Sequence, residues 1–240
     1  KHLARNQFLT INRNIRLWNS CSVLPKKNMC FLPQYMNSLC PLYPIKLIKT
    51  VRFRVVNVEA LLKEPNMNLK VILLVRDPRG VYNSRSSGTI TSWCNSATCA
   101  DPQTGCRDLA ADVEAAERLA ATYPNSITLV RYEDLALRPK DSYIDSHTST
   151  DKMMVKRNKV TGKKEKVKDP YGTARNSTAI AFAWRQELGL DSMREIQEVC
   201  REPMARLGYK RLDSQEELDG VELPLDKTAK EVWTPRIKGN

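Results

Sequence analysis

The sequence of 240 residues lacks several features that would assign it quickly to a class of protein. It has no run of about 18 apolar residues, which excludes a membrane-spanning helix within these residues. It has two histidines, and its cysteines do not show the paired C-x-x-C spacing of a zinc site. A G-x-x-x-x-G-K-[ST] loop is also missing, which argues against a kinase or an NTPase.

Acidic residues are scarce relative to basic ones. There are 39 Lys and Arg against 27 Asp and Glu, so the formal net charge is +12. Such an excess is typical of a protein with an anionic partner: a nucleotide, an acidic glycan, a nucleic acid or a membrane surface. Charge alone does not choose among these. The hydrophobic content of 41% is sufficient for the core of one α/β domain.

Seven cysteines are present, which is many for a cytosolic chain of this length. Three of them form a tight group: Cys94, Cys99 and Cys106. Three others form a looser group: Cys21, Cys30 and Cys40. We expect disulfides formed in an oxidising compartment. Because the number is odd, one cysteine has no intramolecular partner. The alternative is a set of buried, reduced cysteines that act as small hydrophobic residues.

The middle of the sequence predicts a strand, a helix and a second strand. Residues 69–75 form a short aliphatic run, as expected for a parallel strand buried on both faces. Residues 108–123 have the pattern of an amphipathic helix that Asp108 can cap. Residues 126–132 form a second aliphatic run. Short connections between these elements predict a βαβ unit and a parallel sheet.

The flanking regions are less regular. Before the first strand we expect loop with short helical turns over residues 1–48, then a strand over 45–56 that leads into a helical turn over 55–63. Residues 139–170 are predicted to be a basic mobile loop, although such a tract can also bind heparin or nucleic acid. Residues 213–240 are expected to be a frayed tail.

Two helices are predicted between the basic loop and the tail, over residues 177–188 and 191–207. Gly208 suits the position just after the second helix, where a left-handed backbone is common. Pro203 is expected to kink the last turn of that helix, because proline removes one of its hydrogen bonds.

A candidate phosphate site follows the first predicted strand. The strand delivers Arg76 to its carboxyl end, where ligands bind in open parallel sheets, and a guanidinium group matches phosphate oxygens. Pro78 stiffens the turn, and residues 80–85 can begin a helix that offers the Ser84 hydroxyl to the same anion. An ordinary surface turn is the alternative for Arg-Asp-Pro-Arg taken alone.

With the segments around it, this motif resembles the sulfotransferases that use 3′-phosphoadenosine 5′-phosphosulfate (PAPS). In that family an RDPR-like turn followed by serine binds the 3′-phosphate, which implies this role for Arg76 and Ser84. The sequence is similar in particular to the Golgi galactose, N-acetylglucosamine and N-acetylgalactosamine 6-O-sulfotransferases. The similar segments are LIKTVR at 47–52, CRDL at 106–109, VRYEDL at 130–135, YGTARNS at 171–177 and AWR at 183–185.

The resemblance implies a fold and an activity. The fold would be α/β and P-loop-like, with a central parallel sheet flanked by helices, in one incomplete domain over residues 1–212 whose N-terminal strand and loop are missing. The activity would be transfer of a sulfuryl group from PAPS to the 6-hydroxyl of a hexose in a glycan, with no metal. The partners would be PAPS or PAP and a glycan, glycoprotein or proteoglycan acceptor, and no nucleic acid is expected.

A second phosphate arm is implied at Arg175. The family brings a basic loop over the 3′-phosphate and then enters a helix that contains tryptophan, and Arg175 before Trp184 is similar. The alternative is that Asn176-Ser177-Thr178 is a glycosylation sequon.

The catalytic base is not identified. Cytosolic relatives place a histidine after the comparable Lys-Thr strand end, and Val51 occupies that position here. Lys49 and Arg52 are candidates for contact with sulfate or an acidic glycan, and a purely structural strand end is the alternative.

The family's loop around the 5′-phosphosulfate has no counterpart in the sequence. The chain begins with Lys, and we expect the true start, with a single membrane anchor of a type II Golgi protein whose catalytic part faces the lumen, to lie upstream. Two alternatives follow. One is an inactive remnant that binds PAP or a glycan, and the other is a heparin- or nucleic-acid-binding module built on residues 152–168.

Overall fold

The computed structural model describes residues 32–51, 53–86, 94, 96–138, 153–157, 164–168 and 177–233. The chain divides into two compact units, Lys1–Arg52 and Phe53–Asn240. In the first unit, α3 (Pro33–Leu39) and the 3-10 turn η3 (Cys40–Leu42) are followed by extended chain. Residues 45–50, part of a predicted strand, are extended but lie in no strand.

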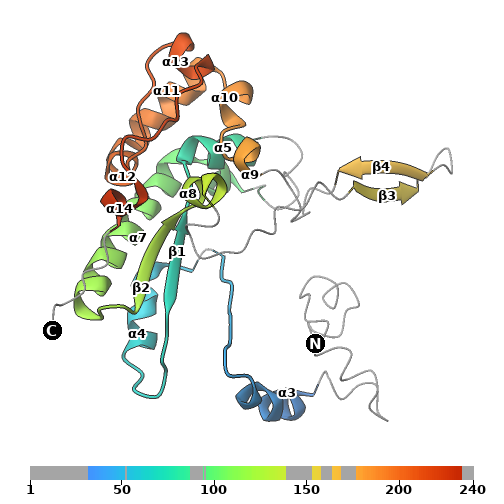
Figure 1. Cartoon of the computed structure of the whole chain (residues 1–240), viewed down its shortest axis with the longest axis vertical. Coiled ribbons are helices and arrows are strands. Elements are labelled where there is room, and N and C mark those ends of the chain that lie inside the picture. The colour runs from blue at the N-terminus through green and yellow to red at the C-terminus, as the bar shows by residue number, and fades with distance from the viewer. Residues whose placement is uncertain are drawn as a thin grey trace. The chain divides into compact units, whose positions relative to one another are not determined.

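The second unit contains the other helices and strands of the described residues (Figure 1). In chain order they are η4 Val55–Asn57, α4 Val58–Leu62, β1 Val71–Val75, α5 Pro78–Ser86, α6 Ala97–Ala100, α7 Pro102–Thr122, β2 Ile127–Arg131, α8 Tyr132–Leu137, β3 Met153–Arg157, β4 Lys164–Lys168, α9 Ser177–Ala181, α10 Trp184–Glu187, α11 Leu190–Val199, α12 Arg201–Arg206, α13 Gln215–Asp219 and α14 Ala229–Val232. In the described ranges, no helix is long and apolar enough to cross a membrane.

Strands β1 and β2 form a parallel pair, which confirms the predicted βαβ unit with α7 as its crossover. Val71 lies opposite Ile127, and Val75 lies opposite Arg131. Parallel strands need a long crossover, and the 21 residues of α7 provide it. The carboxyl ends of both strands therefore meet at one edge of the sheet.

Helix α7 begins earlier than predicted. Its cap is Asp101, whose carboxylate accepts hydrogen bonds from the backbone N–H groups of Gln103 and Thr104. Pro102 fits the first turn because that position needs no N–H donor. Asp108, the predicted cap, lies inside the helix and forms an ion pair with Arg54 at 2.6 Å. The apolar periodicity located the helix but not its cap, because the helix begins at Pro102, before the apolar pattern starts.

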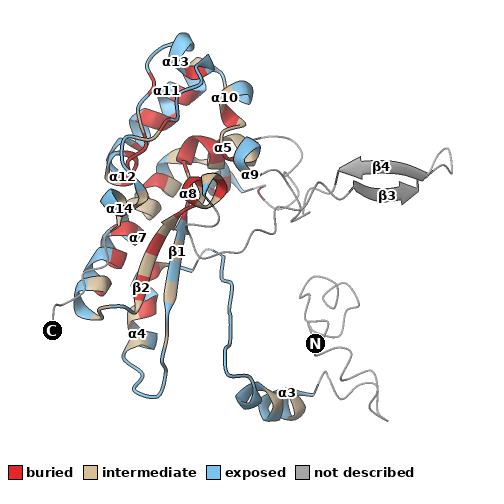
Figure 2. Ribbon diagram, in the orientation of Figure 1, coloured by how far each residue is buried: buried red, intermediate tan, exposed pale blue. Residues whose placement is uncertain are grey.

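The core lies between α7, the sheet and the C-terminal helices (Figure 2). Ala116 and Leu119 of α7 are 0% exposed and pack with Val55, Val58 and Ile127. A neighbouring cluster joins the sheet and α7 to α11 and α12 through Val75, Val113, Leu129, Ile196 and Met204. Burial of this apolar surface is the main force that holds the helices on this face of the sheet.

The other face of β1 is open, which corrects the prediction of a strand buried on both faces. Ile72 is 67% exposed and Leu74 is 57% exposed, whereas Val75 is buried. Side chains alternate between the faces of a strand, so these two share one face. Among the described elements, the sheet of β1 and β2 has no further strand.

The two predicted C-terminal helices are each divided. Residues 177–188 form α9 and α10, and residues 191–207 form α11 and α12 with the division at Cys200. Pro203 cannot donate to the carbonyl four residues earlier, so the division precedes it. Gly208 has φ +69, which confirms the left-handed position predicted for it.

Two regions expected to lack structure contain helices or strands. In the range predicted as a basic mobile loop, β3 and β4 pair antiparallel, with Met153 opposite Lys168. The remainder of that range lies outside the described residues. After Leu212, where we expected a frayed tail, α13 and α14 form, and Leu218 of α13 is 2% exposed.

Candidate nucleotide-binding site

The register of the parallel strands creates the candidate site. Because Val75 lies opposite Arg131, the next residues, Arg76 and Tyr132, leave the two strands side by side. The Arg76 guanidinium carbon lies over the Tyr132 ring, 4.9 Å from its centre. This is a cation–π distance, and it fixes the plane of the guanidinium group at the sheet edge.

Arg76 retains hydrogen-bonding capacity in this position. Its Nη2 donates to the carbonyl oxygen of Ile180 in α9 at 3.2 Å. Its Nε is buried and has no hydrogen-bond partner within the described part of the chain. An unpartnered buried donor costs free energy, so an acceptor that reached it would be stabilising.

Helix α5 approaches Arg76 through Gly80. A Cβ added to Gly80 would lie 3.3 Å from Arg76 Nε and 3.1 Å from Cδ1 of Trp184. The indole nitrogen of Trp184 is also buried without a partner in the described ranges. Two unpartnered N–H groups therefore come from residues that pack against the same glycine.

Ser84 lies one helical turn after Gly80. Residues four apart share a face of a helix, so Ser84 is on the face of α5 that Gly80 presents to Arg76. Ser84 is half-buried. The strand end carries Arg76 and the following helix carries Ser84, and their shared role in binding one anion stays a prediction.

Arg79, the second arginine of the motif, is held by the fold. It is 0% exposed, and its Nη2 lies 2.8 Å from a carboxylate oxygen of Asp77. Its Nη1 donates to the side chain of Gln197 and to the carbonyl of Lys210. Its guanidinium carbon also lies 4.3 Å from the centre of a Trp184 ring. The motif therefore contains one arginine fixed by buried partners and one that is only partly engaged.

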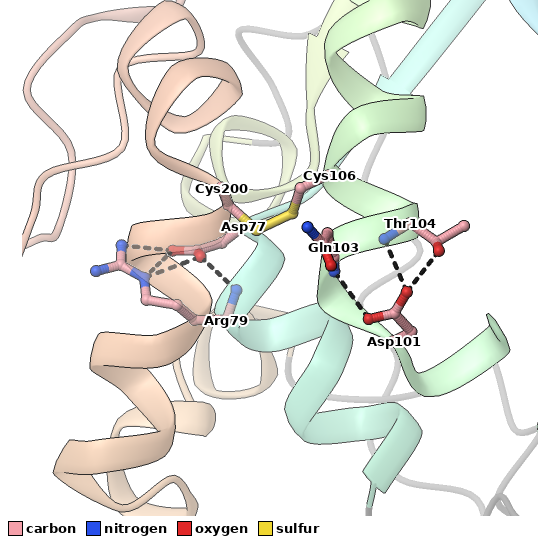
Figure 3. Close-up of a disulfide and its surroundings, with 7 residues drawn as sticks. All are labelled: Asp77, Arg79, Asp101, Gln103, Thr104, Cys106 and Cys200. Atoms are coloured by element: carbon pink, nitrogen blue, oxygen red, sulfur yellow. Dashed lines mark hydrogen bonds and ion pairs between the residues drawn. A yellow bond between two sulfur atoms is a disulfide. The ribbon is translucent and has the colours of Figure 1, made fainter. Parts of the chain in front are cut away.

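A disulfide lies beside this turn and joins α7 to the end of α11 (Figure 3). It links Cys106 to Cys200, which are 94 residues apart in sequence. A second disulfide links Cys94 to Cys99, and Cys40 is an exposed free thiol. The prediction of disulfides is confirmed. These two bonds also exclude the alternative of reduced cysteines for the four residues that form them.

Glu133 connects the ends of the two strands. One carboxylate oxygen accepts the Asp77 backbone N–H at 3.0 Å, and the other accepts the Tyr209 hydroxyl at 2.9 Å. Burial raises the pKa of the Glu133 carboxyl to about 7, and the negative charge of Asp77 acts in the same direction. The hydrogen bonds that it accepts act against this shift. Burial also raises the pKa of Tyr209 well above its usual value.

Comparison with known proteins identifies a family. The zebrafish (Danio rerio) protein carbohydrate sulfotransferase 1 is 37% identical over 203 residues, which cover 75% of this chain and 48% of the relative. The human (Homo sapiens) carbohydrate sulfotransferase 1 is 35% identical over 201 residues, covering 74% of this chain and 48% of the relative. The chain belongs to the carbohydrate sulfotransferase family.

The mouse (Mus musculus) carbohydrate sulfotransferase 5 is more distant, at 30% identity over 218 residues, or 78% of this chain and 53% of that protein. The chain thus spans about half the length of the curated carbohydrate sulfotransferases that it matches. No protein-family model matches the sequence. No solved structure matches it either.

The described structure does not bring the other predicted site residues of this chain to the site. Arg175 and Arg52 lie outside the described residues, as does Asn176 of the sequon. Lys49 is exposed and belongs to the first unit. In the described ranges, no group of three or more His, Cys, Asp or Glu side chains could hold a metal ion.

Three residues of the site were not singled out from the sequence: Tyr132, Glu133 and Ile180. The first two lie in the VRYEDL segment, which supported the family resemblance but was given no role in the site. The signal that could have found them is the parallel register, because residues that leave adjacent parallel strands meet. Ile180 contributes a backbone carbonyl, which any residue at that position could supply.

Proposed function

We propose that the full-length protein is a PAPS-dependent carbohydrate sulfotransferase. It transfers a sulfuryl group to the 6-hydroxyl of a hexose in a glycan: N-acetylglucosamine, galactose or N-acetylgalactosamine. Family membership supports the reaction class, and the similar segments noted in the sequence support the 6-O position. A P-loop-like sulfotransferase fold and a place in the Golgi lumen as a type II membrane protein belong to the same proposal.

The nucleotide site of this proposal is built on Arg76, with Ser84 and Arg175 as further ligands of the 3′-phosphate. The single observation that carries it is the buried Arg76 Nε without a partner at the carboxyl end of a parallel strand, within the described residues. Phosphate oxygens accept strong hydrogen bonds from guanidinium groups, so the residues present fit a phosphate. Arg79 is excluded from this role because its donors are engaged by buried partners.

The proposed chemistry is an in-line displacement. The bond between sulfur and the 5′-phosphate oxygen breaks as a bond forms between sulfur and the acceptor oxygen, and the hydroxyl proton passes to a base that is not assigned. Positive groups near the transferring group would stabilise its developing charge. Lys49 and Arg52 are the candidates for that contact.

The direct test compares two nucleotides. PAP and adenosine 5′-phosphate differ by the 3′-phosphate, so titration calorimetry of both with the 240-residue chain isolates that group. Arg76→Ala should weaken PAP binding roughly 10- to 100-fold, the range of a charge-assisted hydrogen bond. Ser84→Ala should weaken it about 2- to 10-fold. Arg201→Ala, which removes an exposed arginine of α12, should change neither affinity.

Two results would contradict the assignment. One is an unchanged PAP affinity in both Arg76→Ala and Ser84→Ala. The other is an equal loss for PAP and adenosine 5′-phosphate, which would place Arg76 away from the 3′-phosphate. Binding of PAP without sulfuryl transfer by the full-length protein would favour a non-catalytic nucleotide-binding protein instead.

A further inference from the structure

Glu133 holds the backbone that carries Arg76. It accepts the N–H of Asp77, the residue directly after Arg76, at 3.0 Å. The residue directly before Glu133 is Tyr132, whose ring lies under the Arg76 guanidinium group. Glu133 is 0% exposed, and its other oxygen is held by Tyr209. Glu133 is therefore linked to Arg76 in two ways: by its hydrogen bond to the Asp77 backbone and through the neighbouring Tyr132, on which Arg76 stacks. It is not itself a proposed ligand.

The charges packed around Glu133 are paired with one another. Asp77 forms an ion pair with Arg79 at 2.8 Å, and Arg131 forms one with Asp134 at 2.7 Å. Within the described ranges, no Lys or Arg forms an ion pair with Glu133. A negative charge on Glu133 is thus not neutralised by a partner in direct contact.

We propose that Glu133 is the positioning residue of the nucleotide-binding turn, and that its neutral form favours binding of the nucleotide's phosphate. This inference rests on the proposed function, because it assumes that Arg76 binds the 3′-phosphate. Its geometric basis is the hydrogen bond to Asp77, which fixes the turn that aims Arg76.

The neutral form preserves this geometry. A protonated carboxyl group still accepts the Asp77 N–H at one oxygen, and at the other it can donate its proton to the Tyr209 hydroxyl. The ionised form keeps the hydrogen bonds but adds a negative charge close to an anionic ligand. Since the pKa of Glu133 is about 7, the group is neutral below that pH and ionised above it. Affinity should therefore fall as the pH rises through about 7.

The test compares the wild-type chain with Glu133→Gln, which keeps the shape and cannot ionise. The PAP dissociation constant of each is measured by calorimetry from about pH 5.5 to about pH 8.5, a window that spans the Glu133 pKa of about 7. Titration of the ligand's own phosphates cancels in the ratio of the two constants. We expect the two dissociation constants to be nearly equal at the lowest pH. At the highest pH the wild-type chain should bind PAP roughly 3- to 10-fold more weakly than Glu133→Gln.

Two further variants separate position from charge. Glu133→Ala removes the acceptor of the Asp77 N–H and should weaken PAP binding about tenfold even at low pH, whereas Gln rescues it. Tyr209→Phe removes a hydrogen bond that lowers the pKa of Glu133, so the midpoint of the pH profile should move upward. Glu195→Gln, an exposed change in α11, should leave the profile unaltered.

A ratio that stays constant across this pH range would overturn the charge effect. Equal PAP affinities of Glu133→Ala and Glu133→Gln at low pH would overturn the positioning role. In both cases the proposed function stands if Arg76→Ala still weakens PAP binding. If Arg76→Ala has no effect on PAP binding, the proposed function fails, whatever the profile of Glu133→Gln shows.

Discussion

The two strand ends of the sheet use arginine in opposite ways. Arg131 ends β2, is 2% exposed, and donates to both carboxylate oxygens of Asp134 and to the carbonyls of Leu207 and Lys227. Arg76 follows β1, makes its hydrogen bond to the carbonyl of Ile180, and keeps a buried Nε without a partner in the described part of the chain. The parallel register places the two residues at the same edge.

This difference shows which of the two arginines stabilises the fold. Arg131 joins β2 to the backbone around Gly208 and Lys227, and removing it would leave several buried acceptors unpaired. Arg79 does the same between the β1 turn and α11. Arg76 is stabilised mainly by stacking on Tyr132, so its remaining donors are the ones suited to a ligand.

The largest effect should come from breaking the buried pair. Arg131→Leu removes the buried partner of the Asp134 carboxylate, which keeps only the exposed Arg138 at 3.8 Å, and should lower the free energy of unfolding by about 3–5 kcal/mol. Arg76→Leu removes one hydrogen bond and the stacking on Tyr132, but it also removes an unpartnered buried donor, and should lower it by about 1 kcal/mol. Urea unfolding followed by circular dichroism measures both. Equal losses would remove the distinction between the two arginines.

A double variant sharpens this prediction. Arg131→Leu combined with Asp134→Leu removes the negative charge of Asp134 together with its positively charged partner, Arg131. Because an unpaired buried charge is the costly species, the double variant should be more stable than Arg131→Leu alone. A double variant that loses the sum of the two single losses would show that the pair is not coupled.

The next largest effect concerns the disulfide between Cys106 and Cys200. It fastens α11 to α7, and the region after Cys200 supplies the carbonyls of Leu207 and Lys210 to the two buried arginines. Cys200→Ser should lower the free energy of unfolding by about 2–4 kcal/mol, since the bond closes a long loop. Thermal melts of Cys200→Ser and Cys99→Ser measure this.

The control for this prediction is the disulfide between Cys94 and Cys99, whose partners are five residues apart. Closing a short loop constrains the unfolded chain less, so Cys99→Ser should cost less stability than Cys200→Ser. Within the described ranges the segment after Cys200 reaches Arg76 only indirectly, through the hydrogen bond of Tyr209 to Glu133, so PAP affinity of the folded Cys200→Ser chain should change less than about twofold. A larger loss of PAP affinity would connect the two regions that the comparison separates.

Much of the fold was predictable from local pattern. The two aliphatic runs, the periodicity before Tyr123 and the glycine after α12 determine local structure, and each prediction was confirmed in type. The open face of β1 was not predictable, because its exposed residues Ile72 and Leu74 are as apolar as the residues of a buried face. Whether an apolar face is covered depends on elements elsewhere in the chain.

The candidate site was predictable only in part. The motif identified Arg76 and Ser84, but it could not distinguish Arg76 from Arg79, because both arginines flank the same Asp-Pro pair. Only packing separates them: Arg79 meets Gln197, which is 118 residues away in sequence. Glu133 was missed for the same reason, since its contact with Asp77 spans 56 residues and arises from strand pairing.

The smallest effect tests the approach of α5 to Arg76. Gly80→Ala places a methyl group 3.3 Å from Arg76 Nε and 3.1 Å from Trp184 Cδ1, both closer than ordinary contact. The guanidinium group can shift by a few tenths of an ångström, and alanine favours the helix by about 0.5–1 kcal/mol, so stability should change little. A shifted charge-assisted hydrogen bond should weaken PAP binding about fivefold.

Gly189→Ala is the matched control for this variant, because an added Cβ there meets nothing within 4 Å. Calorimetry with PAP and a thermal melt of both variants separate binding from stability. If the two variants bind PAP equally, the guanidinium group tolerates displacement. The charge of Arg76, and not its exact position, would then determine PAP affinity. A selective loss in Gly80→Ala would instead show that the position of the Arg76 guanidinium group, and not only its charge, determines affinity.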